Sequence, residues 1–281
     1  MQLPEIRPML AADVDETADA VLRSGWGDRR VKMAWVAGHA ACRPFVAEAD
    51  GAIVGTGVTT VNGPVGWIGT IWVEPAWRGQ GLGRALTLAT IEAAESAGCS
   101  TLVLVATAAG QPLYERLGFR IQTQYRIVET PGLGHAGAGA GPPRVRAFRD
   151  SDLPAILELD AAATGEDRAH VLTDFAAPAT TQCVERDDGS LGGFVIRAPW
   201  GGGATIAPDP DDAVAILHAR RLASTPERRV RAGLLATNTA GLERLLDDGW
   251  VDAWHAPRMI RGAMPAWQPA AIWGQFDHAI G

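Results

Sequence analysis

Cysteine is scarce in this sequence, with only Cys42, Cys99 and Cys183 among 281 residues. The three are odd in number and far apart, and they form neither a CxxC pair nor a zinc-binding spacing. A disulfide-stabilised scaffold is therefore excluded, and no metal site is expected. A reducing cytoplasm is the compartment that fits this cysteine usage best.

Long apolar runs are also missing. No stretch approaches the roughly 18 residues that a membrane-spanning helix requires, and the first ten residues lack the apolar core of a signal peptide. The net charge is −7, and no basic stripe of the kind that binds nucleic acid is present. We therefore expect a cytoplasmic protein with no membrane or nucleic-acid partner, and a mild preference for cationic partners.

Lysine occurs once, at Lys32, so the other basic residues are all arginine. Together with abundant alanine and glycine, this composition is typical of a high-GC bacterial gene. We attribute the shortage of lysine to that base composition rather than to function.

The length favours two domains, and a Gly/Ala/Pro-rich segment at 132–143 divides the chain into nearly equal halves. Such a composition is typical of a flexible linker. We predict an N-terminal domain over 1–131 and a C-terminal domain over 144–281. Each half is long enough to bury its own hydrophobic core.

The two halves resemble each other. Each begins with a short strand, an aspartate near a helix start and a helix that ends at glycine, from Ile6 in the first half and from Val145 in the second. Each ends with a helix closed by Gly118 or Gly249, followed by an aromatic residue that starts a strand. We interpret this pattern as a duplicated domain that has diverged in its second copy; two unrelated α/β domains are the alternative.

The first half alternates between strand and helix patterns. Asp50-Gly51 lies between two strand-like runs and predicts a hairpin. The whole pattern predicts an α/β fold with a mixed sheet and helices on both faces. The predicted strands are Ile6–Met9, Phe45–Ala49, Ile53–Thr60, Gly66–Val73, Thr101–Ala106 and Phe119–Ile127, and the predicted helices span about 13–24, 28–39, 81–97 and 111–117.

The segment with the clearest chemistry is a glycine-rich turn between the fourth strand and the long helix. Its residues are Arg78, Gly79, Gln80, Gly81, Leu82, Gly83 and Arg84. Glycine lets the backbone bend tightly and approach a ligand, and backbone N–H groups at a helix N-terminus form an anion site that suits a pyrophosphate. The turn is not a Walker loop, because no Gly-Lys-Ser/Thr follows, and it does not follow the first strand of a βαβ unit as a dinucleotide fingerprint does.

This segment resembles the acyl-CoA signature of the GCN5-related N-acetyltransferase (GNAT) superfamily. That signature is Gln/Arg-x-x-Gly-x-Gly/Ala, and the chain has Arg78-x-x-Gly81-x-Gly83 after Val73-Glu74-Pro75. A second family element, Asn-x-x-Ala-x-x-x-Tyr-Glu-x-x-Gly-Phe, is matched in spacing by Thr107-x-x-Gly110-x-x-x-Tyr114-Glu115-x-x-Gly118-Phe119. The departures are threonine for asparagine and glycine for alanine.

The layout of the whole chain is similar to a bacterial subfamily whose second acetyltransferase-like domain is degenerate. Two short motifs of the second half carry this resemblance, Gly165-Glu166-Asp167-Arg168 and Arg258-Met259-Ile260-Arg261-Gly262. The resemblance implies two tandem GNAT-like domains, of which the first binds acetyl-CoA.

The resemblance also implies site residues and a direct transfer within a ternary complex, without a covalent acyl-enzyme. The strand before the loop would splay from its neighbour and pair through its backbone with the pantetheine arm, at Ile71, Trp72 and Val73. The Val73 N–H would stabilise the oxyanion, and Tyr114 would protonate the departing thiolate. Thr107 and Gly110 would complete the contacts to the cofactor.

The second half has a different sequence at the loop position. Pro208-Asp209-Pro210-Asp211-Asp212 replaces the glycines, which removes N–H donors and adds carboxylates that would repel a pyrophosphate. Leu245 stands where the first half has Tyr114. We expect no CoA binding in this half. The aspartates would cap a helix, although attraction of a cationic acceptor is the alternative.

Acceptor residues are less clearly marked. Trp26 and Trp35 are candidates for an acceptor pocket because the family grips its acceptor with the first two helices, whereas core packing is the ordinary role of tryptophan. No general base can be identified: Glu74, Glu48 and His39 are candidates, and each is more often a surface or hydrogen-bonded residue.

The predicted function is transfer of an acetyl group from acetyl-CoA to a primary amine of a small-molecule or amino-acid-like acceptor. Acetylation of a protein or peptide amine and a non-catalytic acyl-CoA-binding or sensing module are the alternatives. The apolar tail with Trp267, Trp273 and Phe276 is expected to dock on a domain or on a partner chain, so a homodimer is one arrangement that it would allow.

Overall fold

The computed structural model describes residues 4–134 and 144–281, so most of the predicted linker lies outside the described residues. The chain forms two compact units. Unit 1 contains the residues up to Arg120 together with Met259–Met264 and Asp277–Gly281, whereas unit 2 contains Ile121–Arg258 and Pro265–Phe276. Within the described residues, no helix has both the length and the apolar character needed to cross a membrane.

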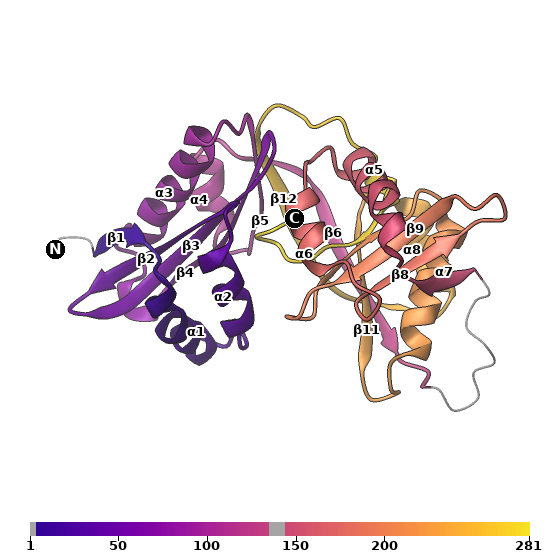
Figure 1. The fold of residues 1–281 in the computed structure, drawn as a ribbon. Helices are drawn as coiled ribbons and strands as arrows, with labels where there is room; N and C mark the ends of the chain where they lie inside the picture. The colour runs from indigo at the N-terminus through magenta and orange to yellow at the C-terminus, as the bar shows by residue number, and fades with distance from the viewer. Residues whose placement is uncertain (1–3, 135–143) are drawn as a thin grey trace. The chain divides into compact units, whose positions relative to one another are not determined.

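Unit 1 has the predicted alternation of strands and helices (Figure 1). The Asp50-Gly51 hairpin is confirmed: φ is 51° at Asp50 and 76° at Gly51, the pair of positive values that a type I′ turn requires. The elements are β1 (Glu5–Pro8), α1 (Val14–Arg23), α2 (Arg30–Gly38), β2 (Cys42–Ala49), β3 (Ala52–Asn62), β4 (Val65–Val73), α3 (Leu82–Ser96), β5 (Thr101–Val105) and α4 (Gln111–Arg116).

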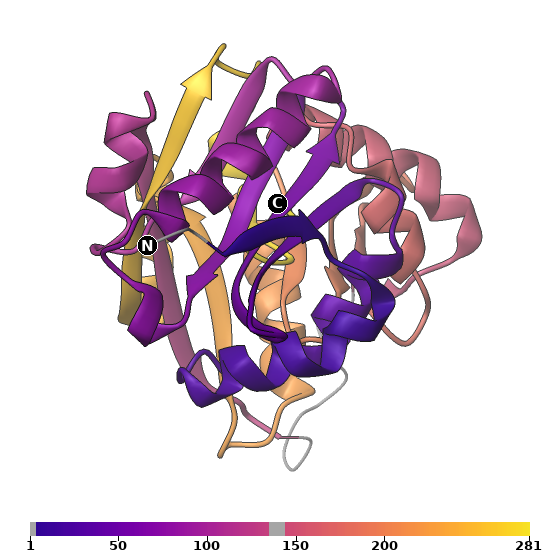
Figure 2. The same ribbon diagram turned by 90° about the vertical axis from the view of Figure 1, so that its left-hand side faces the viewer.

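The strands of unit 1 lie in the order β1-β2-β3-β4-β5. Helices α1 and α2 cover one face, where Val21 and Met33 pack with Val58 and Trp72 of the sheet. Helix α3 covers the other face (Figure 2). The prediction of a mixed sheet with helices on both faces is therefore confirmed, because β1 to β4 pair antiparallel whereas β4 and β5 pair parallel.

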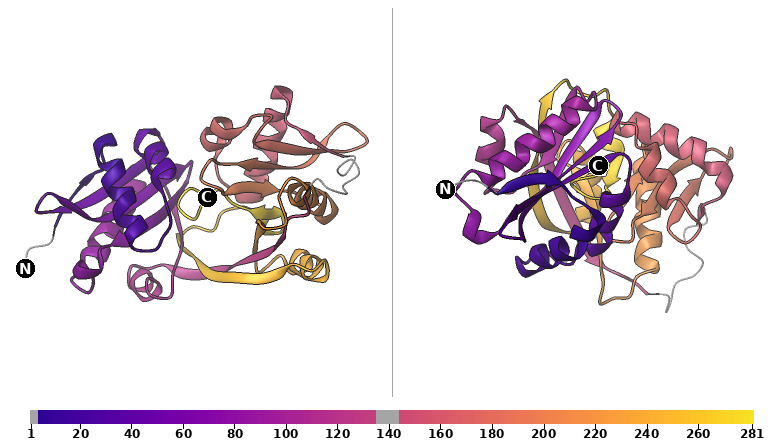
Figure 3. Two further views of the ribbon diagram at one scale, coloured as in Figure 1. Left: turned by 90° about the horizontal axis from the view of Figure 1, so that it is seen from below. Right: turned by 60° about the vertical axis from the view of Figure 1, so that its left-hand side comes forward.

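Unit 2 repeats this order of elements. Helices α5 and α6 lie on one side of its five-stranded sheet and α7 on the other (Figure 3). The sheet has the strand order β13-β10-β9-β8-β7. The elements are β7 (Val145–Ala147), α5 (Leu153–Thr164), α6 (Ala169–Phe175), β8 (Thr181–Glu185), β9 (Leu191–Arg197), β10 (Gly203–Ile206), α7 (Pro210–Leu222), β11 (Arg229–Leu235), α8 (Thr239–Asp247), β12 (Val251–Gly262) and β13 (Ile272–Gly274).

The boundary between the two compact units does not coincide with the linker, because each half of the chain contributes a strand to the other unit. Strand β6 (Arg120–Pro131) follows α4 directly, yet it pairs antiparallel with β11 through seven residues in unit 2. The end of β12 lies beside β5 in unit 1, where Thr101 donates a hydrogen bond to the carbonyl of Ala263 at 2.9 Å. The compact units therefore differ from two contiguous domains over 1–131 and 144–281.

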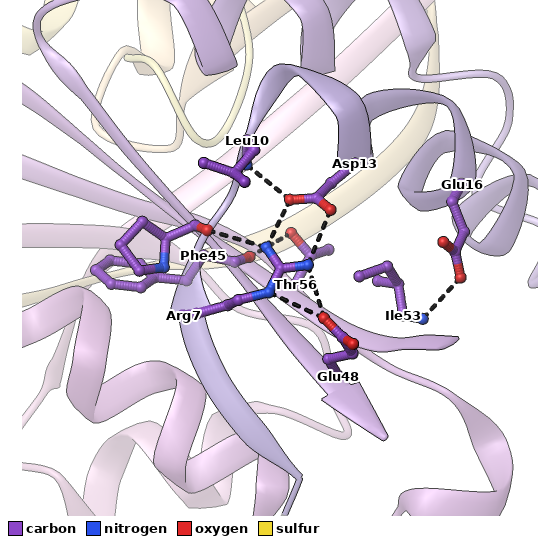
Figure 4. A network of polar contacts seen from close by, with 9 residues as sticks. Arg7, Leu10, Asp13, Glu16, Phe45, Glu48, Ile53 and Thr56 are labelled. Atoms are coloured by element: carbon purple, nitrogen blue, oxygen red, sulfur yellow. Dashed lines mark hydrogen bonds and ion pairs between the residues drawn. The ribbon is translucent and has the colours of Figure 1, made fainter. Parts of the chain in front are cut away.

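A shared side-chain network shows the duplication directly. In unit 1, Arg7 on β1 donates hydrogen bonds to both carboxylate oxygens of Asp13, at 2.7 and 2.9 Å, and to Glu48 on β2 (Figure 4). The same Asp13 carboxylate accepts the N–H of Leu10 at 2.7 Å and so closes the turn before α1. The Arg7 guanidinium lowers the pKa of Asp13 by hydrogen bonding.

Unit 2 repeats these bonds almost atom for atom. Arg146 donates to both carboxylate oxygens of Asp152 at 2.7 and 2.9 Å, and it also binds Glu185. The Asp152 carboxylate accepts the N–H of Arg149 at 2.8 Å, and Arg146 lowers its pKa. The aspartate near each helix start thus links the arginine of the first strand to the turn before the helix, and the same arginine binds a glutamate of the next strand. Asp152 is buried, whereas Asp13 is partly exposed.

The two short motifs of the second half, which begin at Gly165 and Arg258, contribute to a buried charged cluster in unit 2. Arg168 binds both carboxylate oxygens of Asp160, and each side chain is about 1% exposed. Arg258 lies 3.9 Å from Glu166 and stacks on the Trp267 ring. Burying such charges is tolerated only when each has an opposite partner, so these motifs fix the interior of unit 2.

We predict that Asp13→Asn and Asp152→Asn each lower the free energy of unfolding by roughly 1–3 kcal/mol, because each removes one of the two carboxylates that bind the arginine and the charged acceptor of a backbone N–H. The loss should shrink as the pH falls below about 4, since a carboxyl with a depressed pKa stabilises the fold only while it is ionised. Urea unfolding at several pH values measures both effects. Asp15→Asn, on the exposed face of α1, is the matched control and should change little.

Candidate functional site

Strand β4 leaves its neighbour β5 part-way along its length. The parallel pairing covers Val65–Thr101, Gly66–Leu102 and Trp67–Val103. Beyond Trp67, β4 continues for six residues to Val73 with no further β5 partner in this register. A strand edge with open N–H and C=O groups can pair with an extended ligand.

A β-bulge lies within this open part of β4. Gly69 pairs with Val58 and Trp72 pairs with Thr56, so Thr70 and Ile71 together oppose one residue of β3. Thr70 has φ 53°, which is a left-handed conformation unusual for a β-branched residue. A bulge bends the strand and redirects its backbone groups, so the bulge determines where the last residues of β4 point.

Val73 occupies the end of this redirected edge. The Glu74 N–H donates to the Val54 carbonyl at 2.9 Å, so the adjacent pair Val73–Gly55 is the non-hydrogen-bonded kind, whose backbone groups point away from β3. The Val73 carbonyl accepts the side-chain Nε of Arg78 at 2.9 Å. The Val73 N–H is therefore directed to the edge that β5 has left open.

The glycine-rich turn meets this edge at the start of α3. Gly79 and Gly81 have φ values of 75° and 91°, and an added Cβ on either would meet nothing within 4 Å. Glycine is thus required there for backbone conformation, and space is left above the turn. Gly81 is the N-cap of the 15-residue helix, and no side chain among the described residues caps it. The first backbone N–H groups of α3 therefore remain open for an anion.

Charged and polar side chains surround this turn. Arg78, Gln80 and Arg84 are exposed, whereas Leu82 is buried and anchors the helix to the sheet. Gln80 donates to the Ala76 carbonyl at 2.9 Å, which closes the turn before the glycines. The site therefore has both the open N–H groups and the positive charge that a pyrophosphate requires.

Tyr114 lies on α4 with its ring against Phe119, edge to face at a centroid distance of 6.2 Å. It is 9% exposed, and burial raises the pKa of its phenol to about 12. Gly110 gives the ring room, because a Cβ there would lie 2.9 Å from the Tyr114 ring, and its N–H donates to the Thr107 hydroxyl at 3.2 Å. A neutral phenol of this kind can donate a proton throughout the physiological pH range.

Unit 2 lacks this arrangement. At the start of α7, the Asp209 carboxylate accepts the N–H of Asp211 at 2.9 Å, so a side chain caps the helix from within. Asp212 is buried and bound to Arg144 and Arg186. The prediction that these aspartates cap and charge a helix N-terminus is confirmed for Asp209. Leu245 is a core residue of unit 2.

The remaining candidate residues have mixed surroundings. Trp26 is 37% exposed, and Trp35 is half-buried and stacks on His39 at 4.3 Å. His39 accepts the Ala41 N–H through Nδ1, and Glu48 belongs to the Arg7 network. These contacts occupy His39 and Glu48, two of the three general-base candidates.

Comparison with known proteins gives two family matches. Residues 11–119 match the acetyltransferase (GNAT) family, and residues 156–273 match an acetyltransferase (GNAT) domain. The chain belongs to the GNAT family. It is a tandem GNAT protein, and the open β4 edge, the glycine turn and Tyr114 all lie in its first GNAT unit.

Individual relatives match shorter parts of the chain. A glucosamine 6-phosphate N-acetyltransferase from Trypanosoma brucei brucei is 36% identical over 83 residues, which are 27% of this chain and 56% of the relative. A mycothiol acetyltransferase from Thermobispora bispora is 41% identical over 85 residues, 27% of this chain and 29% of the relative. The chain thus spans about half or less of these relatives.

One solved structure has the fold of the whole chain. A Pyrococcus horikoshii protein described as an acetyltransferase superposes with a TM-score of 0.83 at 19% identity, covering 100% of this chain and 97% of that one. At this identity the likeness shows the fold alone.

Sequence reasoning did not single out a polar cluster beside the β4 bulge. Lys32 on α2 is 4% exposed, and its Nζ donates to Asp277 at 2.9 Å and to the Thr70 hydroxyl at 3.3 Å. Burial lowers the pKa of the adjacent His278, although Asp277 partly opposes this. The uniqueness of Lys32 in the sequence was the one available signal, and its partner is 245 residues away.

We predict that Gly81→Asp abolishes acetyl-CoA binding, since it forces a left-handed conformation on a non-glycine residue and places a carboxylate where the pyrophosphate would lie. Isothermal titration calorimetry measures the loss. Gly201→Asp is the matched control, because Gly201 also has a positive φ and open space around its Cβ but lies in a loop of unit 2. Equal losses in both variants would contradict the assignment.

Proposed function

We propose that unit 1 transfers an acetyl group from acetyl-CoA to a primary amine of a small-molecule or amino-acid-like acceptor, by direct attack in a ternary complex. The observation that carries this proposal is the uncapped, glycine-lined N-terminus of α3 at the end of an open β4 edge. An anion site next to an unpaired strand suits a ligand that has a pyrophosphate at one end and an extended amide-containing arm at the other.

The residues divide the chemistry of the transfer. The backbone N–H groups of the turn hold the pyrophosphate, and the edge from Ile71 to Val73 pairs with the pantetheine arm. As the amine nitrogen attacks the thioester carbon, negative charge develops on the carbonyl oxygen, and the Val73 N–H stabilises it. The C–S bond then breaks, and the Tyr114 phenol donates its proton to the leaving thiolate.

Deprotonation of the acceptor is a separate requirement. An amine with a pKa near ~10.4 is neutral in about one molecule in 10³ at pH 7, which costs roughly 4–5 kcal/mol. A neighbouring base or a chain of water molecules must offset that cost. Two titratable groups of unit 1 lie next to these residues in the sequence. Glu74 follows Val73, and His278 follows Asp277, whose carboxylate binds Lys32.

Unit 2 has a supporting role in this proposal. Its Asp209 cap occupies the helix end that would otherwise receive an anion, and Leu245 has no acidic proton. We therefore expect one acetyl-CoA molecule per chain. Two molecules per chain by calorimetry would contradict this division of roles.

The activity is tested with named amines. Purified protein and acetyl-CoA are incubated with glucosamine 6-phosphate, spermidine, a set of free amino acids or a lysine-containing peptide, and the released CoA thiol is measured. Turnover with a small amine supports the proposal, whereas turnover with the peptide alone favours peptide acetylation. Acetyl-CoA binding without turnover on any of these amines at any pH favours the sensing module.

We predict that Tyr114→Phe lowers kcat by about 10²–10³-fold while the affinity for acetyl-CoA changes less than about twofold, because only the proton donor is lost. The pKa of about 12 adds a pH prediction. Tyr114 stays protonated below pH ~11, so the wild-type rate should show no alkaline loss from this residue in that range. Steady-state kinetics from pH 6 to 10 and calorimetry together measure both outcomes. An unchanged kcat would remove Tyr114 from the mechanism.

A further inference from the structure

The β4 bulge needs an external support. Thr70 holds a left-handed conformation that is strained for a β-branched residue, and such a conformation persists only where the surroundings fix it. Thr70 also immediately precedes the edge residues Ile71–Val73. The groups that contact Thr70 therefore decide whether this edge is in place.

Lys32 provides one such contact. Its Nζ reaches from α2 to the Thr70 hydroxyl at 3.3 Å, and the stem of this side chain is buried. A buried ammonium needs a charged partner, and Asp277 supplies it at 2.9 Å. Burial by itself would raise the pKa of Asp277, but Lys32, together with His278 and Arg29, outweighs burial and keeps the pKa below its usual value.

The segment Asp277–Gly281 is itself firmly held in unit 1. The Thr60 hydroxyl donates to the Ala279 carbonyl at 2.8 Å, and the Asn62 amide donates to the Ile280 carbonyl at 2.9 Å, both from buried side chains on β3. Gly69 lets the segment pack against β4, because a Cβ at that position would lie 2.3 Å from the Cβ of Ala279. Asp277 is thus presented to Lys32 from a fixed support.

We propose that the Lys32–Asp277 ion pair is a positioning element for the acetyl donor: it holds Thr70 in the bulge and so keeps the edge Ile71–Val73 directed at the pantetheine arm and the acyl carbonyl. This inference rests on the proposed function of unit 1. By this proposal, residues 277–281 support the donor site of unit 1, although they lie at the opposite end of the sequence from most of that unit.

Comparing the binding of two ligands distinguishes this positioning role from a general effect on stability. Acetyl-CoA uses both the glycine turn and the β4 edge, whereas adenosine 3′-phosphate 5′-diphosphate has the pyrophosphate but no pantetheine arm. We expect Lys32→Met and Asp277→Asn each to weaken acetyl-CoA binding about tenfold and to leave binding of the nucleotide unchanged, as measured by calorimetry on the full chain. Arg30→Met, which removes two exposed ion pairs from the same helix, is the matched control and should affect neither ligand.

Two additional variants complete the test. The first controls for loss of folding stability, and the second tests the bulge itself. Lys32→Met combined with Asp277→Leu leaves no unpaired buried charge, so it should fold and still show the tenfold loss rather than the product of two losses. Thr70→Asn introduces a residue that accepts the left-handed conformation more readily, and it should restore part of the acetyl-CoA affinity in the Lys32→Met background.

The outcomes are distinct. Equal weakening of both ligands, or unchanged acetyl-CoA binding in all three pair variants, would overturn the positioning role while leaving the proposed function in place. Failure of the wild-type protein to bind acetyl-CoA would instead overturn the proposed function, and the inference with it.

Discussion

The separation of β4 from β5 after Trp67 is the constraint on which the site in unit 1 depends. Parallel pairing holds the two strands together over three residue pairs, and β4 then continues with β3 as its partner on the other side but without β5. An unpaired edge inside a sheet exposes backbone groups that would ordinarily bond a neighbouring strand. Three features of the site depend on this opening. The bulge at Thr70 bends the open part of β4, Val73 directs its N–H to the open edge, and the glycine turn at Gly81 lies at the end of that edge.

Duplication explains why the chain has two units but one such site. The Arg7–Asp13 and Arg146–Asp152 networks have the same atoms at the same distances, so the packing of the first strand, turn and helix has been kept in both copies. The glycine turn has diverged. In unit 2 a side-chain carboxylate caps the helix at the position where unit 1 leaves its N–H groups open, so the same helix end is closed to an anion.

The exchange of strands gives the second half a role in the first unit. Met259–Met264 and Asp277–Gly281 are part of unit 1, and β6 of the first half is paired in unit 2. The first GNAT unit therefore contains a strand end and an aspartate from the other half of the chain, and this aspartate, Asp277, pairs with the buried Lys32.

The sequence by itself determined the local features of this protein. The Asp-Gly hairpin, the helix-capping aspartates, the glycine turn and the order of strands and helices follow from turn, cap and periodicity signals that act within a few residues. The resemblance of two motifs to GNAT signatures also marked the glycine turn and Tyr114 as candidates for the chemistry. The tertiary structure decided which distant segments meet: β6 with β11, the end of β12 with β5, and Asp277 with Lys32. Those partners are selected by packing and by the pairing of charges between segments far apart in the sequence, with 162 residues between Thr101 and Ala263 and 245 between Lys32 and Asp277, and no short-range pattern in the sequence encodes that choice.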